Sequence, residues 1–345
     1  MTQNPSTPPA HRTSEPVKIE IDDSLEAVGP DAWDAVHAGS RLRAPFLAWT
    51  WQREWVGVFA EGRRLELRRV VDAAGRLVAL LPLVEIGPQR FMLAGGADVS
   101  DYLDLLALRG EETDAWAALL EARAASRAVW ELHAVPAASP TVTALPGLAA
   151  AAGLVAHAPV EERCPVVALP ESWDAFLAAL PKKHRHELTR KLRRFEREIP
   201  DGRIAWETTP AGIDTRLEHF LALHRASRAG KAKFMDARME RFFRRVIVAL
   251  AARGAARLAF LDVAERPIAA FVMLEWEDTV GLYNSGFAPE RAALSPGLVL
   301  LAGVVRDAIE RGRRRFDFLR GEERYKYEFG PSAEEVHAVT IEARA

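Results

Sequence analysis

An internal repeat limits how this chain can fold more than any other feature of its sequence. Residues 72–79 read DAAGRLVA, and residues 262–269, 190 positions later, read DVAERPIA. In both places a β-rich run comes before the charged turn and an apolar run follows it, which is the pattern of a β-hairpin. Because self-similarity is typical of a duplicated structural unit, we expect two copies of one hairpin.

The two halves stay similar beyond the hairpins. Each continues with a β-like run, then a helical segment, then a short strand, so both halves have the order β-β-β-α-β. The β-like runs are 102–107 and 280–285, the helices 113–126 and 296–311, and the strands 129–133 and 315–319. This order predicts an α/β (α+β) fold with two mixed β-sheets flanked by helices.

Chain length and local composition divide the sequence. The 345 residues exceed the usual size of one domain, and an Ala-, Pro- and Gly-rich stretch at 134–160 separates the halves. We therefore expect an N-terminal domain over 17–163 and a C-terminal domain over 164–345. Residues 1–16 are rich in Pro, Ser and Thr and almost free of large apolar side chains, so we expect a disordered tail there.

Charge balance and reactive side chains exclude several functions. With 46 basic and 48 acidic residues, the chain has no overall attraction for nucleic acid or anionic lipid, and we expect no DNA partner. Cys164 is the only cysteine and the nine histidines lack metal-ligand spacing, so we expect neither a disulfide within the chain nor a metal site. No apolar run is long enough for a transmembrane segment and the N-terminus has no signal pattern, which predicts a cytoplasmic protein.

A strongly basic helix is expected at 181–199, after a shorter helix at 172–180. Leu188, Leu192, Phe195 and Ile199 recur at helical spacing and predict one buried face. Its other positions hold three glutamates and eight cations: Lys182, Lys183, Arg185, Arg190, Lys191, Arg193, Arg194 and Arg197. The cations form either a solvated face or a contact surface for phosphates of a cofactor, a nucleotide-linked acceptor or an RNA.

A second candidate site is the helix start at residues 294–298, LSPGL. Ser295 is a preferred N-cap and Pro296 fits the first helical position. Beyond a well-formed helix start, free amides at Gly297 and Leu298 together with the helix dipole would suit a phosphate.

The C-terminal run GEERYKYEFG, residues 321–330, directly follows the expected strand at 315–319. Ligands of α/β proteins bind at the carboxyl ends of strands. Tyr325, Lys326 and Tyr327 could stabilise an oxyanion or protonate a leaving group; the alternative is an edge segment with a solvated lysine and packed tyrosines.

Three tryptophans lie close together near the N-terminus, at positions 49, 51 and 55. Core packing is the favoured interpretation, and a stacking wall for an acceptor is the alternative.

Together these features resemble a known family. The duplicated units, the basic helix, the Ser-Pro-Gly helix start at 295–297, and Phe-Asp-Phe at 316–318 followed by Gly321 and Tyr-Lys-x-x-Phe-Gly at 325–330 look like the BioF2-like acyltransferases. These belong to the GNAT (N-acetyltransferase) superfamily and are related to CelD cellulose-biosynthesis proteins and FemAB peptidyltransferases. The resemblance covers residues 20–340 and is densest from 164 to 330.

The resemblance implies a tandem GNAT fold whose C-terminal copy binds an activated acyl donor, with the N-terminal copy shaping the acceptor cleft. The strands expected at 280–285 and 315–319 would separate to admit the donor's pantetheine arm. This sequence departs from the usual GNAT diphosphate pattern, Arg/Gln-x-x-Gly-x-Gly/Ala, because only Arg291 and the later Gly297 remain. No permanently bound cofactor is implied, and acyl-CoA is the expected co-substrate.

The leading hypothesis is an N-acyltransferase that moves an acyl group from acyl-CoA or acyl carrier protein to an amine. Lys326 is assigned to the oxyanion, Tyr283 or Tyr325 to leaving-group protonation, and Asp317 or Asp104 to acceptor orientation. The donor contacts are assigned to Arg185, Arg291, Ser295 and Gly297, and further substrate contacts to Trp49 and Glu322.

Two alternatives remain open. One is a FemAB-like, tRNA-dependent aminoacyl transferase that acts on an envelope precursor in cell-envelope or exopolysaccharide synthesis. The sequence shows no long antiparallel helical arm for tRNA; residues 214–253 predict only shorter helices around a basic, glycine-containing loop at 225–233. The other alternative is a catalytically silent binding platform, because one fold hosts many functions.

Overall fold

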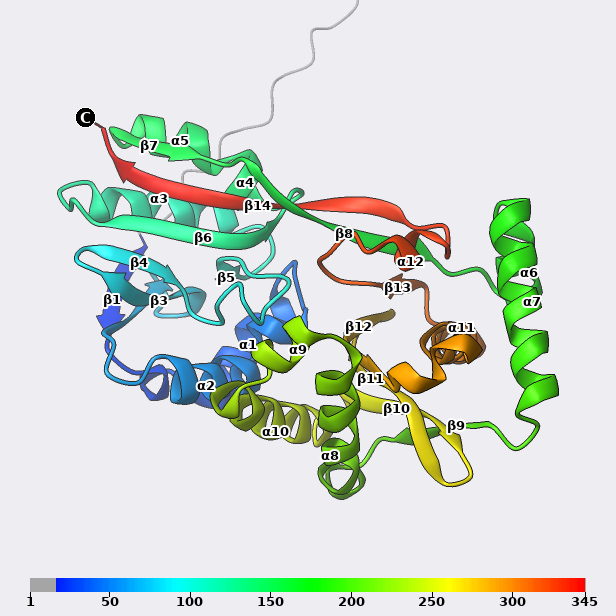
Figure 1. Ribbon diagram of the computed structural model, residues 1–345. Helices are drawn as coiled ribbons and strands as arrows, with labels where there is room; N and C mark the ends of the chain where they lie inside the picture. Colours follow the sequence, from blue (N-terminus) through cyan, green and yellow to red (C-terminus); the bar gives the residue numbers. More distant parts are fainter. Residues whose placement is uncertain (1–16, 345) are drawn as a thin grey trace, which may run out of the picture.

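One mixed sheet of 14 strands runs through the computed structural model, which describes residues 17–344 (Figure 1). The disordered tail expected at 1–16 lies outside the described residues. The strand order along the sheet is β1-β2-β3-β4-β6-β14-β8-β13-β12-β11-β10-β9, with β5 beside β3 and β7 beside β14. The expected mixed α/β fold is therefore confirmed, although its two sets of strands join in one sheet.

The two halves repeat one topology, here called the first and second units. The first unit comprises β1 (Lys18–Asp22), α1 (Gly29–Gly39), α2 (Trp49–Phe59), β2 (Leu65–Val71), β3 (Leu77–Gly87), β4 (Arg90–Leu93), β5 (Leu106–Ala107), α3 (Glu112–Arg123) and β6 (Val129–Pro136). The second comprises β9 (Arg203–Glu207), α8 (Pro210–Ser227), α9 (Ala229–Phe234), α10 (Ala237–Ala251), β10 (Ala256–Val263), β11 (Arg266–Trp276), β12 (Thr279–Phe287), α11 (Pro296–Glu310) and β13 (Arg315–Asp317).

Strand pairing confirms the duplication that the repeat predicts. In each unit the first four long strands are antiparallel neighbours, and a helix then returns the chain to a strand parallel to the fourth. The parallel pairs are β4 with β6 and β12 with β13. The repeated octapeptides are the turns between β2 and β3 and between β10 and β11.

One predicted strand is wrong. Residues 102–107 were expected to be the counterpart of β12, but that position is taken by β4, and only Leu106–Ala107 forms a strand, β5. The chain leaves the sheet at Gly95 and Gly96, whose positive φ angles of 104° and 62° suit glycine. The apolar residues that follow are buried in a loop, which explains why their pattern resembled a strand.

The strands that follow the two units are exchanged. After the first unit come α4 (Pro140–Thr143), α5 (Leu145–Ala151), β7 (Leu154–His157) and β8 (Val160–Ala168); after the second come α12 (Arg324–Tyr327) and β14 (Ser332–Ala343). β8 pairs with β13 of the second unit, and β14 pairs with β6 of the first. β8 and β14 also pair with each other, so β14 runs between the two units (Figure 1).

The remaining elements cover the sheet or lie at its edge. They are η1 (Leu25–Ala27), η2 (Pro45–Leu47), α6 (Trp173–Ala179), α7 (Lys182–Glu198) and η3 (Pro289–Leu294). α2 packs against α10, which joins the helical layers of the two units. α7 is the expected basic helix: Leu188 and Phe195 are buried, and the helix packs against α11 and η3. Within residues 17–344, no helix is both long and apolar enough to cross a membrane.

Gly286 provides a test of the packing between sheet and helix. A Cβ atom at this position of β12 would overlap the α8 backbone at Leu223 and His224. We expect Gly286→Ala to lower the free energy of unfolding by about 2 kcal/mol, because backbone atoms cannot move aside as a flexible side chain can. Chemical denaturation would measure this change.

Gly147 is the matched control, because a Cβ there meets no atom within 4 Å and the residue lies in helix α5. Gly147→Ala should leave stability unchanged or raise it slightly. Equal stability of the two variants would contradict the close approach of α8 to β12.

Candidate functional site

The parallel strands β12 and β13 separate at one end of the second unit. They pair only at three positions, from Thr279 with Arg315 to Gly281 with Asp317. β12 then continues to Phe287, whereas the chain after Asp317 turns toward β8, and the Phe318 amide donates to the Pro165 carbonyl. A bulge in β12 leaves Tyr283 without a cross-strand partner in β11. Bulges often occur next to active sites, where they redirect the strand.

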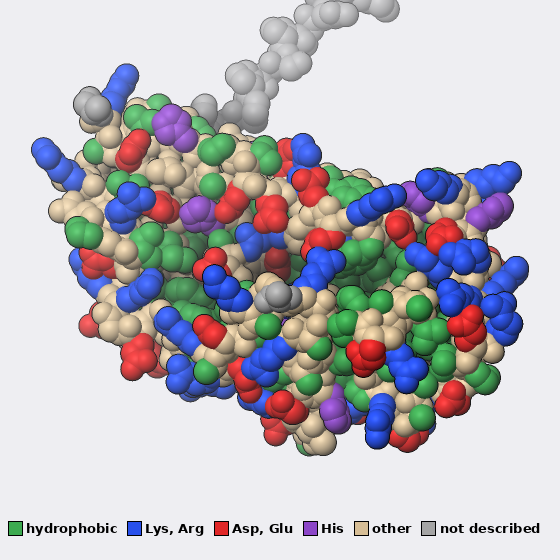
Figure 2. Space-filling view, in the orientation of Figure 1, with side chains coloured by type: hydrophobic (Ala, Val, Ile, Leu, Met, Phe, Trp, Pro, Cys, Tyr) green, Lys and Arg blue, Asp and Glu red, His purple; other side chains and the backbone are tan. Residues whose placement is uncertain are grey.

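A cavity of about 260 Å³ lies at this separation, and we call it the β12–α11 pocket. It is mainly apolar, with a few polar groups, as small-molecule sites usually are. Its lining residues are Ser227, Arg228, Lys231, Phe271, Ser285, Phe287, Ala292, Ser295, Pro296, Gly297, Leu298, Glu323 and Tyr325. Figure 2 shows a hollow in the middle of this face, with hydrophobic side chains inside it and charged side chains around it.

The start of α11 lines the pocket, as the sequence predicted. Ser295 has a left-handed backbone (φ 52°, ψ 48°) and its side chain caps no amide of the helix. A non-glycine residue in this region carries strain that is common at functional sites. The amide of Leu298 donates to the Ser295 carbonyl, so of the two expected free amides only that of Gly297 has no acceptor within the described chain. Gly297 itself lines the pocket, and a Cβ at this position would meet open space.

Lys231, which the sequence analysis did not single out, lies in the same pocket. It belongs to α9, within the basic loop noted at 225–233, and its Nζ donates to the backbone oxygen and the Oγ of Ser285. Burial and then the neighbouring charge of Arg228 lower the pKa of Lys231 to about 8. A lysine with such a pKa can exchange a proton near neutral pH. Its position on a loop helix far from the C-terminal motif gave no sequence signal beyond the local basic composition.

The C-terminal motif places Tyr325 and Glu323 in the pocket, but not Lys326. Lys326 is only 3 % exposed, and its Nζ donates to the carbonyls of Arg320 (2.7 Å) and Gly321 (2.9 Å) and to the Glu323 carboxylate (2.9 Å). An ammonium group has three protons, so these partners use all of them. An oxyanion contact by Lys326, as the sequence predicted, would have to replace one of these three bonds.

The ionisation of the pocket groups follows from their surroundings. Burial raises the pKa of Glu323, but the hydrogen bond and charge of Lys326 outweigh this effect and hold the pKa below its ordinary value. Burial, and then the charge of Glu323, raises the pKa of Tyr325. At neutral pH the pocket thus presents a carboxylate, a phenol that keeps its proton and a lysine close to its pKa.

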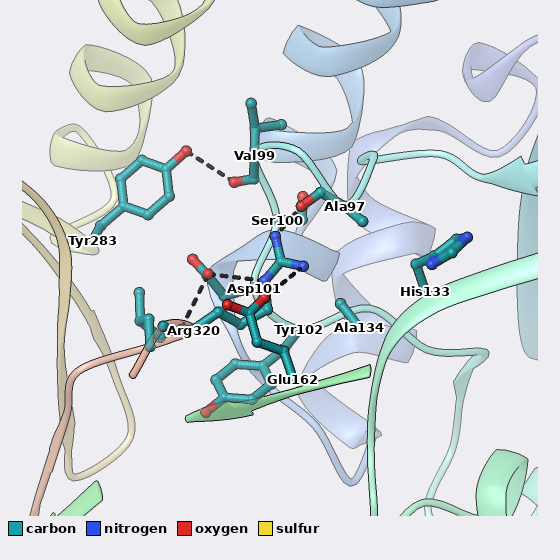
Figure 3. A network of polar contacts seen from close by, with 12 residues as sticks. Ala97, Val99, Ser100, Asp101, Tyr102, His133, Ala134, Glu162, Tyr283 and Arg320 are labelled. Carbon is teal, nitrogen blue, oxygen red and sulfur yellow. Dashed lines mark hydrogen bonds and ion pairs between the residues drawn. The ribbon is translucent and has the colours of Figure 1, made fainter. Parts of the chain in front are cut away.

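A polar network joins the pocket walls to the first unit (Figure 3). Arg320 donates from its backbone amide (3.3 Å) and its Nε (3.2 Å) to Asp101 and also contacts the Ala97 carbonyl. Tyr283 donates through its hydroxyl to the Val99 carbonyl over 2.8 Å. Burial, and then the charge of Asp101, raises the pKa of Tyr283 well above its ordinary value. The loop that follows β4 is thereby attached to β12 and to the chain after β13.

Asp317 lies beneath this network and does not line the pocket. It is 1 % exposed and accepts hydrogen bonds from the Tyr102 hydroxyl and the Leu319 amide, both over 2.8 Å. Burial raises the pKa of Asp317 to about 6. Burial likewise raises the pKa of the neighbouring Cys164 thiol. In this arrangement Asp317 holds the first-unit loop in place.

The other predicted residues do not line the β12–α11 pocket. Arg185 is on α7 and donates to the Ala178 carbonyl, and Arg291 is an exposed residue of η3. Trp49 is 7 % exposed and packs edge-on against Trp33, as the core interpretation expected. Glu322 is exposed and accepts a hydrogen bond from Tyr327. The structure therefore brings together Ser295, Gly297 and Tyr325, with Tyr283 and Lys326 in the adjoining walls.

Asp104 belongs to the corresponding region of the first unit. It lines a separate cavity of about 190 Å³ with Glu112, which lies at the start of α3. Asp104 accepts from Ser139 and Thr141, both at 2.5 Å, and burial raises its pKa to about 6. Glu112 accepts from the Gly110 amide over 2.7 Å. Carboxylates at this helix start disfavour a phosphate, so the two units do not offer equivalent sites.

Comparison with known proteins assigns a class to the second unit. Residues 182–327 match the acetyltransferase (GNAT) domain family. This match supports a transferase and includes every residue of the β12–α11 pocket. The sequence matches no protein of curated function.

Solved structures share the fold of nearly the whole chain. FemX superposes with a TM-score of 0.62 at 11% identity, over 92% of this chain and 96% of that one. L-PGS from Bacillus licheniformis gives 0.58 at 12% identity over 92% of each chain. The C-terminal DUF2156 domain of a proposed lysylphosphatidylglycerol synthetase from Agrobacterium fabrum gives 0.58 at 12% identity over 90% of each chain. At these identities the similarity establishes the fold alone.

The contacts of Lys326 predict that it contributes to stability. Lys326→Met removes three hydrogen bonds from a charged donor and leaves two loop carbonyls without their partner. We expect the free energy of unfolding to fall by about 2 kcal/mol, which corresponds to several degrees in Tm. Lys183→Met, at an exposed position of α7, should leave Tm unchanged. A Lys326→Met variant as stable as the wild type would show that the ammonium is not held by these partners.

Proposed function

We propose that this protein is an N-acyltransferase that moves an acyl group from a thioester on CoA or acyl carrier protein to an amine. The observation that carries the proposal is the β12–α11 pocket. It combines a separated pair of parallel strands, the glycine-containing start of a helix, and four ionisable side chains at the edge of an apolar cavity: Arg228, Lys231, Glu323 and Tyr325. The GNAT domain match over residues 182–327 supports the same class of reaction.

The donor would lie along the open edge of β12. Beyond Gly281 this edge has no β13 partner, which leaves room for an extended pantetheine arm beside β12, although the Ser285 carbonyl already accepts from Lys231. The phosphates would approach the start of α11, where Ser295 and Gly297 line the pocket. Arg228 lines the same pocket and supplies positive charge, and Arg291 lies nearby on η3.

The reaction requires attack by a neutral amine on the thioester carbonyl carbon. A C–N bond forms as the C–S bond breaks, the amine loses one proton, and the leaving thiolate gains one. We assign Lys231, in its neutral form, as the base that accepts the proton lost by the amine. Its pKa of about 8 suits a base near neutral pH. Tyr325 keeps its proton because burial raises its pKa, so it can donate to the thiolate. Glu323 would hold the incoming amine through its carboxylate.

The buried residues around the pocket have positioning roles in this scheme. Lys326 holds Glu323 in place through the 2.9 Å ion pair and also binds the loop at Arg320 and Gly321. Tyr283 and Asp317 fix the first-unit loop. Loss of any of them would move the pocket walls. In this scheme Lys326 does not contact the oxyanion directly and acts instead by holding Glu323 in place.

A second candidate is aminoacyl transfer from tRNA to an envelope precursor. The basic helix α7 favours it, because the helix packs beside η3 and α11 and therefore next to the pocket. Its exposed Lys182, Lys183 and Arg193 have no carboxylate partner within the described chain. FemX and the lysylphosphatidylglycerol synthetase domain share the fold. Such a donor leaves through a ribose oxygen, which Tyr325 could also protonate.

A donor panel separates these candidates. We expect the wild-type protein to transfer an acyl group from acyl-CoA or acyl carrier protein to an amine in a single-turnover assay followed by mass spectrometry. Tyr325→Phe should bind the donor with unchanged affinity and transfer about a hundredfold more slowly, since it loses only the proton donor. Tyr327→Phe, at a half-buried neighbouring position, is the control.

Transfer only from charged tRNA would favour the second candidate. No transfer from any of the three donors would favour a binding platform. A normal rate of acyl transfer in Tyr325→Phe would show that Tyr325 does not protonate the leaving group.

The pKa of Lys231 predicts a pH profile. Below pH 8 most of the side chain is protonated and cannot accept a proton, so kcat should rise about tenfold per pH unit up to roughly pH 8 and then level off. The charged groups near Lys231 are Arg228, Glu323 and Lys326. Lys231→Met should lower kcat and abolish the rise. Lys233→Met, an exposed position of α9, should keep the wild-type profile, and a rise that survives in Lys231→Met would assign it to another base.

A further inference from the structure

A polar hollow lies at the end of the first unit's sheet where the parallel strands β4 and β6 begin. In the second unit the β12–α11 pocket lies at the opposite end of the corresponding strands. The hollow of the first unit is bordered by the starts of β2 and β6 and by the turn after α3. We call it the arginine pocket, and its charged and aromatic lining residues are Arg64, Glu66, Arg68, Glu85, Phe91, Arg127 and Trp130. None of these residues belongs to the β12–α11 pocket.

The last residue of α3, Arg123, does not line this pocket but contacts two residues that do, Ala128 and Trp130. It is 1 % exposed, and its Nη2 donates to the Ala128 carbonyl. Its Nε and Nη1 are buried and have no hydrogen-bond partner among residues 17–344. Burial, and then the charge of Arg68, lowers the pKa of Arg123 to about 10, so the side chain still carries its charge at neutral pH. An arginine in this state is costly unless an anion compensates it.

A second guanidinium lies close by. Arg68 and Arg123 lie 4.9 and 4.6 Å from the ring centroid of the same indole, that of Trp130. Arg68 forms an ion pair with Glu66, yet its Nε has no hydrogen-bond partner in the described chain. Glu66 is also shared with Arg64, whose Nη2 lies 3.2 Å away. The Glu66 carboxylate therefore serves two arginines, and within residues 17–344 neither Arg123 nor the exposed Arg127 forms an ion pair with an acidic residue.

In the second unit the arginines at the corresponding position are neutralised by a buried glutamate. There the buried Glu275 of β11 accepts from Arg257, Arg311 and Arg313 at 2.7–3.2 Å. Arg257 lies over an indole ring, that of Trp206, at 3.8 Å. By strand register the first-unit counterpart of Glu275 is Glu85. Glu275 lies on β11, next to the parallel pair of β12 and β13, and Glu85 lies at the same register position on β3, next to the parallel pair of β4 and β6. Glu85 also lines the arginine pocket, but within residues 17–344 it forms no ion pair with these arginines and accepts a hydrogen bond from the Gln89 amide.

We propose that the arginine pocket binds a small oxyanion, namely the phosphate or carboxylate group of a small molecule. The bound group supplies the negative charge that Glu275 supplies to the arginines of the second unit. Guanidinium groups suit this role because their paired N–H donors match the oxygens of carboxylate and phosphate. The side chains that would contact it are Arg68, Arg123 and Arg127.

Thermal unfolding with added anions tests this site without any acyl donor, so its outcome does not depend on the proposed transferase activity. Sodium phosphate and sodium succinate are compared with sodium chloride at equal ionic strength. A ligand that binds only the folded state raises Tm with its concentration. We expect at least one of the two anions to raise the wild-type Tm by about 3 °C or more. A phosphate-only shift identifies the group as phosphate, and a succinate-only shift as carboxylate.

Variants locate the bound anion. Arg123→Met keeps the apolar stem and removes the uncompensated charge, so it should be at least as stable as the wild type in chloride and lose the anion-dependent shift. Arg127→Met, at an exposed position where folding is not at risk, should weaken the anion dependence about tenfold. Arg109→Met is the exposed control and should respond as the wild type does.

Three results would overturn the proposal. One is a wild-type Tm that phosphate and succinate leave unchanged. Another is an undiminished shift in both Arg123→Met and Arg127→Met. The third is a shift that Lys231→Met abolishes and the two arginine variants retain, because the anion would then occupy the β12–α11 pocket.

Discussion

The pairing of β8 with β14 is the interaction on which the rest of this structure depends. Each of these strands follows one unit and pairs with the last strand of the other, so that both units share one sheet. Backbone hydrogen bonds fix the register, and a shift by one residue would turn every side chain to the opposite face. The loop after β4 and the chain after β13 are held side by side as a consequence.

The β12–α11 pocket therefore depends on both units, although no residue of the first unit lines it. Asp101 and Tyr102 of the first unit bind Arg320 and Asp317 of the second. Arg320 then contacts Lys326, which holds Glu323 at the pocket. A change in the first unit can therefore alter the pocket through packed, hydrogen-bonded neighbours.

The two units have diverged in charge while they kept one topology. At the start of α11 the pocket offers Ser295 and a glycine amide, whereas the corresponding helix α3 begins with Glu112 beside the buried Asp104. At the other end of the sheet the second unit neutralises its arginines with Glu275, and the first unit leaves Arg123 without an acidic partner in the described chain. The place suited to an anion thus lies at one end of the strands in the first unit and at the opposite end in the second.

The sequence by itself determined the duplicated β-β-β-α-β order, the basic helix and the start of α11, because hairpin turns, helical periodicity and caps are local patterns. It misplaced one strand, since the buried loop at 102–107 has the same apolar spacing as a strand. The strand exchange, the position of Lys231 and the buried contacts of Lys326 were decided only by the tertiary structure. Each depends on residues far apart in the chain, and no local pattern records which distant carbonyl or carboxylate will use the protons of an ammonium group.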